Sequence, residues 1–446
     1  MVYLLTWHMS LVCVHRQSGA LVHRALPLIA DDVEPAVLDV PLEFLQPSFA
    51  HYLQAISPTL PDSPPGILQK FRMQWTSDQR TITFEQEGRL LSAEAGREEL
   101  TLVRTKVGDW EAFLPLSQAD LDALQLILRS SWVVRSSGEL VERAACGRFF
   151  NLKLGSLTVD VRSQVPLDLT DWPFRLTLLR DGWRIEQICQ YRPLIYYTAF
   201  GSDDILQQFA ISVSSLIRFG QYQGPILLLT DRTRAELAAL LPPENLARVA
   251  IMPFRPSDRP GFLAARYLIV DWLEGWQFQP LLYVDADIVF DRDVAPMLHA
   301  IATSDRIAAP VELQTTLARH VASGASLMQR DQISPGYMAG FNSGTLGIPN
   351  LRHHASTLRL IRQIIMNHSV IHGRTSLPFV DQEVANYVSF RLAHVDTVLV
   401  SRYVRYGGEN ADIHNRCGLF HFWMVAGAAN RAQAMREYVT RLEAAT

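Results

Sequence analysis

The chain has 446 residues, more than a single hydrophobic core usually holds, so we expect at least two domains. Hydrophobic residues make up 48% and charged residues 19% of the sequence, a balance that allows buried cores and excludes wholesale disorder. The formal net charge of −4, with no run of Lys or Arg, argues against nucleic acid as a partner. No apolar run approaches the roughly 20 residues that a membrane-spanning helix needs.

The four cysteines are scattered along the chain, and none belongs to a C-x-x-C pair. A disulfide framework or a cysteine zinc site is therefore not expected, and this usage is typical of a reducing compartment. Residues 1–16 resemble a signal peptide only weakly, because they lack a positively charged start and polar residues interrupt the apolar stretch. We therefore expect a cytoplasmic protein.

Residues 1–190 are predicted to form an all-β domain, because short apolar runs alternate there with turn residues. A pattern recurs three times within them. Runs that start at residues 9, 88 and 147 are each followed by a second run, which starts at 34, 110 and 172 respectively. Each copy opens with an apolar strand, turns at Gly, Asn or Asp, and closes on a second strand. Three such units resemble a β-trefoil of the fascin-like or lectin-like kind.

Residues 191–446 alternate strand-like and helical patterns, which predicts an α/β domain that begins near Tyr191. Residues 194–199 form the first expected strand. Apolar residues recur at helical spacing from 206 to 217 until Gly220, and residues 225–230 form the next strand. This β-α-β start implies a parallel pair of strands, and ligands of such sheets bind beyond the carboxyl ends of the strands.

An acidic pair follows the apolar strand expected at residues 281–284. Asp285 and Asp287 are two residues apart, so both side chains point the same way if the strand geometry persists. Two carboxylates on a rigid support suit a divalent metal, which can bridge an anionic diphosphate. A lone Asp-x-Asp motif is common, however, and Asp291 and Asp293 form a second one that we interpret as a turn and helix cap.

Three motifs occur in the order found in glycosyltransferase family 8, the glycogenin and bacterial galactosyltransferase group. The first is Asp285-Ala286-Asp287, the second runs over residues 341–346, and the third over residues 381–386. The resemblance covers roughly residues 194 to 435. It implies a Rossmann-like GT-A catalytic domain that transfers a hexose from a UDP-sugar to an acceptor with retention of configuration, using Mn²⁺ or Mg²⁺.

The second and third motifs carry the sugar-binding residues that the resemblance implies. Asn342, Ser343 and Gly344 would place backbone and an amide beside the donor sugar, although the same residues could form a simple turn. Asp381 and Gln382 would contact the sugar hydroxyls, with Gln382 near the reacting anomeric carbon. The alternative for this pair is an ordinary cap at a helix start.

The resemblance also implies a basic residue that holds the aspartates and phosphates, and Arg266 occupies that position in a predicted helix. A surface arginine is the alternative. From their position at the end of the first strand, Thr198 and Ala199 would approach the nucleotide base and ribose.

The family's third metal ligand is a histidine in a His-x-x-Gly-x-x-Lys motif, and His421 is its best match. The sequence departs from that motif, since Met424 replaces the Gly and Gly427 replaces the Lys. Arg431 is a candidate to grip the diphosphate in place of the Lys. A packed core histidine remains the alternative for His421.

We therefore predict a metal-dependent glycosyltransferase whose partners are a nucleotide sugar and an acceptor of unknown identity. One alternative is a glycan- or protein-binding protein with an inactive transferase domain, which the loss of the family's Gly and Lys keeps open. The other is a sugar nucleotidyltransferase. That class needs a Gly-rich basic phosphate loop after the first strand, whereas residues 200–204 are acidic.

Overall fold

The computed structural model describes residues 2–8, 10–26, 31–38, 68–77, 81–118, 121–122, 125, 131–137, 140–146, 149–154, 157–160, 175–180, 184–316, 320–334, 339–373, 376–408 and 412–445. The chain divides into two compact units. The first comprises Met1–Trp132 and Leu140–Gln190, and the second comprises Val133–Glu139 and Tyr191–Thr446.

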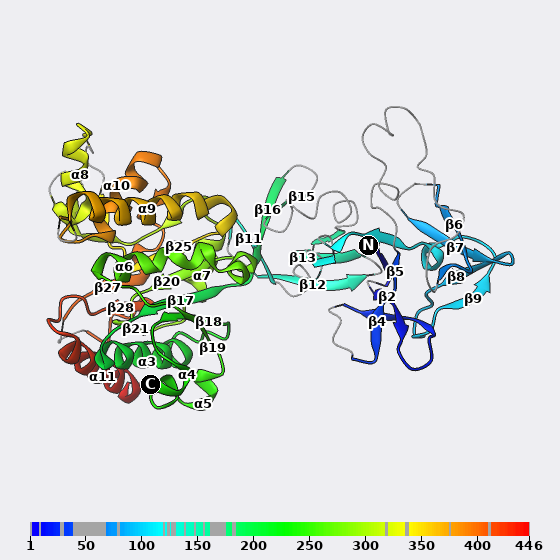
Figure 1. Cartoon of the computed structure of the whole chain (residues 1–446), viewed down its shortest axis with the longest axis horizontal. Coiled ribbons are helices and arrows are strands. Elements are labelled where there is room, and N and C mark those ends of the chain that lie inside the picture. Colours follow the sequence, from blue (N-terminus) through cyan, green and yellow to red (C-terminus); the bar gives the residue numbers. More distant parts are fainter. Residues whose placement is uncertain are drawn as a thin grey trace. The chain divides into compact units, whose positions relative to one another are not determined.

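Antiparallel strands build the described part of the first unit (Figure 1). The strands of this half of the chain are β1 (Val2–Leu5), β2 (Ser10–His15), β3 (Leu21–Ala25), β4 (Val33–Pro35), β5 (Val37–Leu38), β6 (Arg72–Trp75), β7 (Ile82–Gln86), β8 (Arg89–Ser92), β9 (Thr101–Arg104), β10 (Leu114–Leu116), β11 (Ser131–Val134), β12 (Leu140–Cys146), β13 (Phe149–Leu154), β14 (Leu157–Asp160), β15 (Arg175–Arg180) and β16 (Arg184–Tyr191). A 3₁₀ helix, η3, spans Asp109–Glu111.

These strands form three sheets. One has the order β10-β1-β2-β3, with β4 on β2 and β5 on β1; the second is β6-β7-β8-β9; and the third is β14-β13-β12-β11-β16-β15. Phe71, Phe84 and Phe113 meet edge to face in the core of the unit. The three-fold trefoil interpretation is not confirmed and stays a prediction. Residues 9, 147, 148 and 172–174, which belong to two of the three repeats, lie outside the described residues.

The second unit is organised around a seven-stranded mixed sheet with the order β19-β18-β17-β20-β25-β22-β26. Its strands are β17 (Leu194–Ala199), β18 (Ile226–Thr230), β19 (Val249–Pro253), β20 (Leu281–Val284), β22 (Ile307–Ala308), β25 (Thr345–Ile348) and β26 (Val395–Asp396). Strands β19, β18, β17 and β20 run parallel, and β25 pairs antiparallel with β20. The predicted β-α-β start is therefore confirmed.

Two smaller sheets and the helices complete this unit. The sheets are β21-β28-β27 and β23-β24. Their strands are β21 (Ile288–Phe290), β23 (Val311–Thr316), β24 (Ala339–Phe341), β27 (Val404–Tyr406) and β28 (Leu419–His421). The helices are α3 (Asp203–Arg218), α4 (Arg234–Ala238), α5 (Pro243–Leu246), α6 (Arg259–Ala264), α7 (Ala295–Ala302), α8 (Ala325–Arg330), α9 (Leu351–His372), α10 (Asp381–Leu392) and α11 (Ala428–Ala444), with 3₁₀ segments η5 (Ala265–Asp271), η6 (Leu273–Gln277), η7 (Val321–Ser323) and η8 (Ser401–Tyr403).

Helices cover both faces of the central sheet (Figure 1). Because successive side chains of a strand point to opposite faces, β17 sends Tyr196 to one core and Ile195 and Tyr197 to the other. The first core includes η5, α9 and α10, and the second includes α3 and α7. A strand buried on both faces explains the continuous apolar runs in the sequence. Among the described helices, none combines the length and apolar character that crossing a bilayer requires.

Candidate metal and sugar-binding site

A cavity of about 540 Å³ opens in the second unit. Ten residues singled out from the sequence line it: Arg266, Asp285, Asp287, Asn342, Ser343, Gly344, Asp381, Gln382, His421 and Arg431. They come from η5, the loop after β20, the turn between β24 and β25, the start of α10, the end of β28 and the start of α11. Segments far apart in the sequence thus converge on one site, which the topology of the sheet places at the carboxyl end of β20.

Asp285, Asp287 and His421 form a cluster in which one ligand atom of each lies within 4.8 Å of the others. Strand pairing explains how they meet. β21 begins directly after the acidic pair and runs antiparallel to β28, so that His421 lies opposite Ile288. The backbone N–H of Phe422 donates to the carbonyl of Asp287 at 3.0 Å, and His421 Nε2 lies 3.1 Å from Asp287 Oδ1.

The cluster fits a divalent cation. Two carboxylates and an imidazole are ligands that Mn²⁺ accepts, and Mg²⁺ favours the carboxylates. His421 is 2% exposed, and its Nδ1 atom has no hydrogen-bond partner within the part of the chain that the structure describes. Gly344 keeps the space open, because a Cβ at this position would lie 2.6 Å from Asp285 Oδ2 and 2.6 Å from His421 Cε1. The donor set and the absent side chain at residue 344 both suit a bound ion.

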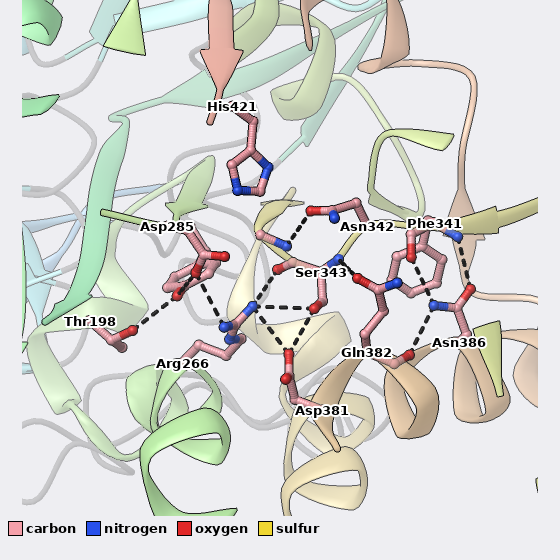
Figure 2. A network of polar contacts seen from close by, with 12 residues as sticks. Thr198, Arg266, Asp285, Phe341, Asn342, Ser343, Asp381, Gln382, Asn386 and His421 are labelled. Carbon is pink, nitrogen blue, oxygen red and sulfur yellow. Dashed lines mark hydrogen bonds and ion pairs between the residues drawn. The ribbon is translucent and has the colours of Figure 1, made fainter. Parts of the chain in front are cut away.

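Two arginines flank the acidic pair. Arg266 is 6% exposed, and its guanidinium lies 3.2 Å from both Asp285 Oδ1 and Asp381 Oδ2. It also donates to the carbonyl of Ser343 at 2.7 Å, as Figure 2 shows. Arg431, in the first turns of α11, donates to Asp287 Oδ2 at 2.7 Å. Arg266 is therefore a buried bridge, whereas Arg431 reaches the cavity from its rim.

Burial and neighbouring charges shift the pKa values of Asp287, Asp381 and His421. Burial alone would raise the pKa of Asp287, but His421 and Arg431 outweigh it and hold that pKa below its usual value. Burial alone would lower the pKa of His421, but Asp287 and Asp285 raise it above its usual value. Burial raises the pKa of Asp381, although Arg266 opposes this shift. Asp287 therefore stays ionised, as a metal ligand must be.

The turn at residues 342–344 is tied to the start of α10 (Figure 2). The Ser343 hydroxyl donates to Asp381 Oδ2 at 2.7 Å, and the Ser343 N–H donates to Gln382 Oε1 at 3.3 Å. The Gly344 N–H donates to Asn342 Oδ1 at 2.9 Å. Further along α10, Asn386 exchanges two hydrogen bonds of 2.9 Å with the backbone of Phe341. Asn386 thus fastens β24 to the helix, while Asp381 and Gln382 face the cavity.

Helix α10 begins under backbone strain. Val380 precedes it with a φ of 37°, in the left-handed region that β-branched residues rarely adopt. Such strain persists only where the surrounding structure enforces it, and it is frequent at functional sites. Here it lies directly before Asp381 and Gln382.

The structure does not bring Thr198 and Ala199 to the described cavity lining. Ala199 is 1% exposed and belongs to the core on the α3 side of the sheet. The Thr198 hydroxyl hydrogen-bonds at 2.9 Å to that of Tyr283, which in turn donates to Asp285 Oδ1. Thr198 is therefore linked to the acidic pair through Tyr283. The predicted contact of both residues with base and ribose stays a prediction.

Arg266 lies in the 3₁₀ segment η5 and not in the expected α-helix, because α6 ends at Ala264.

Glu312 is a site residue that the sequence motifs do not identify. It lies on β23, lines the cavity and is 7% exposed. A single glutamate outside any motif carries no signal in the sequence, so only the fold reveals it.

The second acidic pair lies outside this cavity. Asp291 is 2% exposed and accepts hydrogen bonds from Arg405, Tyr438 and the N–H of Gly418 at 2.7, 2.9 and 2.9 Å. Asp293 Oδ1 accepts from the N–H of Ala295 at the start of α7. These contacts are structural: Asp293 forms the expected turn, and Asp291 forms a buried network that spacing alone did not indicate.

No protein-family model matches the chain, and no curated protein sequence matches it. Solved structures similar to part of it include glycosyltransferases. A galactosyltransferase, LgtC, in complex with donor and acceptor sugar analogues is 15% identical, with a TM-score of 0.40 over 56% of this chain and 95% of that chain. The WbbM bifunctional glycosyltransferase is 13% identical, with a TM-score of 0.40 over 57% of this chain and 51% of that chain.

A third similar structure is mouse xyloside xylosyltransferase 1, which is 12% identical, with a TM-score of 0.35 over 52% of this chain and 96% of that chain. The chain is thus distantly similar in structure to these glycosyltransferases.

Proposed function

We propose that the second unit is a metal-dependent GT-A glycosyltransferase of the family 8 kind, which transfers a hexose from a UDP-sugar to an acceptor hydroxyl with retention of configuration. One observation carries the proposal. A three-ligand cluster suited to a divalent cation shares a single cavity with Asn342, Asp381 and Gln382, which are suited to binding sugar hydroxyls. A structural metal site would need no such group of polar side chains beside it.

The donor diphosphate is assigned to the metal cluster and Arg431. Asp285, Asp287 and His421 would hold Mn²⁺ or Mg²⁺, which when bound neutralises the diphosphate charge and that of the departing UDP. Gly427 occupies the position of the family's Lys, and Arg431 would supply the missing positive charge, because its guanidinium suits a phosphate as well as it suits Asp287. Arg266 balances the charges of Asp285 and Asp381 within the site.

The donor sugar is assigned to the turn at residues 342–344 and to the start of α10. Asp381 and Gln382 would contact the sugar hydroxyls, and Gln382 Oε1 would lie near the anomeric carbon. In transfer, the bond between the anomeric carbon and the β-phosphate oxygen breaks, and its electron pair leaves with UDP. The acceptor oxygen forms the new bond on the same face, and its proton passes to the departing phosphate oxygen. Gln382 Oε1 would stabilise the positive charge that develops on the sugar.

The test is a panel of UDP-sugars, including UDP-galactose, UDP-glucose and UDP-xylose, assayed for Mn²⁺-dependent release of UDP to water or to added sugars. We expect release from at least one donor, and a loss of at least about 100-fold in Asp287→Ala with the fold retained. A wild-type protein that binds UDP with Mn²⁺ but releases none from any donor would favour the inactive binding protein. Near-normal turnover by Asp287→Ala would place the site elsewhere.

A further inference from the structure

Glu312 is a buried carboxylate without a cationic partner. The ion pairs of the cavity go to Asp285, Asp287 and Asp381, and within the described residues no arginine, lysine or histidine pairs with Glu312. At 7% exposure, an unpaired carboxylate is costly to bury. Such a local conflict with packing rules is expected where a residue serves function.

Glu312 is held instead by two side-chain amides of the proposed sugar site. Its Oε2 atom accepts a hydrogen bond of 3.0 Å from Asn342 Nδ2 and another of 3.0 Å from Gln382 Nε2. The oxygen ends of the same amides accept from backbone N–H groups, Asn342 from Gly344 and Gln382 from Ser343 (Figure 2). Each amide therefore has a single orientation that satisfies both of its ends.

This arrangement acts on Gln382 in two ways. It fixes the orientation of the carboxamide, so that Oε1, and not Nε2, lies beside the Ser343 N–H. It also places the negative charge of Glu312 on the nitrogen end of the amide, which strengthens that hydrogen bond and makes Oε1 more negative. A more negative Oε1 interacts better with a sugar carbon that gains positive charge.

We propose that Glu312 is a positioning residue that orients and polarises the Gln382 carboxamide for glycosyl transfer. The inference rests on the proposed function, and it assigns to this glutamate an action on the transfer step through Gln382. Glu312 itself need not touch the substrate.

The decisive substitution is Glu312→Gln. Its carboxamide oxygen can accept both N–H groups as Oε2 does now, so the shape of the site persists while the charge is lost. With the UDP-sugar that turns over best in the Mn²⁺ assay, we expect kcat to fall about tenfold, the difference between a charged and a neutral hydrogen bond. KM for the donor should stay within about twofold, because binding of the ground state is not affected.

A double-mutant cycle separates action through Gln382 from an independent role. In a Gln382→Ala background, Glu312→Gln should change kcat by less than about twofold, because the group through which it acts is gone. Glu111→Gln is the matched control, since Glu111 is 4% exposed, lies in the first unit and lines no part of the cavity. It should leave kcat unchanged.

If Glu312→Gln lowered kcat by the same factor in the wild type and in the Gln382→Ala variant, the inference would be overturned, because Glu312 would then act independently of Gln382. A rise in donor KM with unchanged kcat would also overturn it, by showing direct binding of the donor. A wild-type protein with no turnover of any UDP-sugar contradicts the proposed function and removes this inference with it. A wild-type protein that does turn over a UDP-sugar, together with independent effects of the two substitutions, contradicts this inference and leaves the proposed function standing.

Discussion

Among single residues, the absence of a side chain at position 344 defines the space between the metal ligands. A Cβ there would also lie 2.8 Å from Asn342 Oδ1, so three side chains crowd the same point. We expect Gly344→Ala to displace these ligands and weaken Mn²⁺ binding about 10-fold to 100-fold, the range for disturbed supporting contacts of metal sites. Calorimetric titration with Mn²⁺ measures the affinity.

Gly408→Ala is the control for this prediction, because a Cβ at residue 408 would meet nothing within 4 Å. Circular dichroism shows whether both variants fold. Equal Mn²⁺ affinities of folded Gly344→Ala and wild type would mean that the ion does not bind at this cluster.

Arg431 is the residue that distinguishes this site from the family's Lys-containing motif. Its guanidinium lies on the Asp287 side of the cavity, so Arg431→Met removes a cation from a place where a diphosphate would be gripped. With Mn²⁺ present, UDP affinity should fall about tenfold, as for a lost charged hydrogen bond. Mn²⁺ affinity without UDP should not fall, since the variant leaves Asp287 with less neighbouring positive charge.

The matched control is Arg436→Met, because Arg436 lies on the same helix, bonds Gln207 and does not line the cavity. Fluorescence or calorimetric titrations with UDP and with Mn²⁺ give both affinities. An unchanged affinity for UDP in Arg431→Met would leave the diphosphate without this contact and contradict the assignment.

Among the helices and strands, Asp291 of the second acidic pair connects two strands to the C-terminal helix. Asp291 follows β21 and bonds Arg405 on β27 and Tyr438 on α11. Asp291→Asn leaves Arg405 without its buried partner, so we expect a loss of roughly 3 kcal/mol of unfolding free energy. Urea denaturation measures this loss, and Mn²⁺ affinity should stay unchanged.

Asp293→Asn serves as the comparison, since Asp293 is less buried and its side chain makes the turn contact to Ala295. We expect it to cost no more than about 1 kcal/mol. If Asp291→Asn abolished Mn²⁺ binding while remaining folded, the two Asp-x-Asp pairs would have been assigned the wrong way round.

The elements that sequence predicts well are those whose signal is local. The run at residues 194–199, the helical spacing that follows it and the run at 225–230 each carry their own hydrophobic pattern, and the structure has β17, α3 and β18 there. The candidate site was predictable where polar residues follow such elements, as Asp285 and Asp287 follow β20. The family's motif order then indicated His421.

Contacts that depend on long-range pairing were not predictable. The antiparallel register of β21 and β28 brings His421 to Asp287, and the local sequence of neither short strand predicts that pairing. Glu312 becomes part of the cavity only because Asn342 and Gln382 meet it there. The 3₁₀ form of η5 and the strained Val380 likewise follow from packing that overrides local preference.

For the molecule as a whole, every described residue that lines the cavity comes from between Arg259 and Arg431. We predict that a chain of residues 191–446 binds UDP with Mn²⁺ within about threefold of the full chain, because it keeps that lining and the hydrophobic clusters on both faces of the central sheet. The segment Val133–Glu139 would be lost with the buried Val133 and Val134, so we expect the shortened chain to be less stable, but none of the segment's described residues lines the cavity.

Calorimetry of UDP binding with Mn²⁺, on full-length and shortened protein of equal folded fraction, checks this prediction. A folded shortened chain that does not bind UDP would show that the first unit contributes to the donor site. In that case the two predicted domains, 1–190 and 191–446, would not be functionally separable.

The proposed function depends above all on a divalent cation, held by Asp285, Asp287 and His421, that binds the diphosphate of a nucleotide sugar. Calorimetric titration of UDP into the full-length protein, with Mn²⁺ and again with the metal removed by chelator, measures this dependence. We expect UDP to bind at least about tenfold more tightly with Mn²⁺, and His421→Ala to remove most of this gain. Equal UDP affinity with and without Mn²⁺, or a full gain in His421→Ala, would show that the cluster does not hold the diphosphate through a metal.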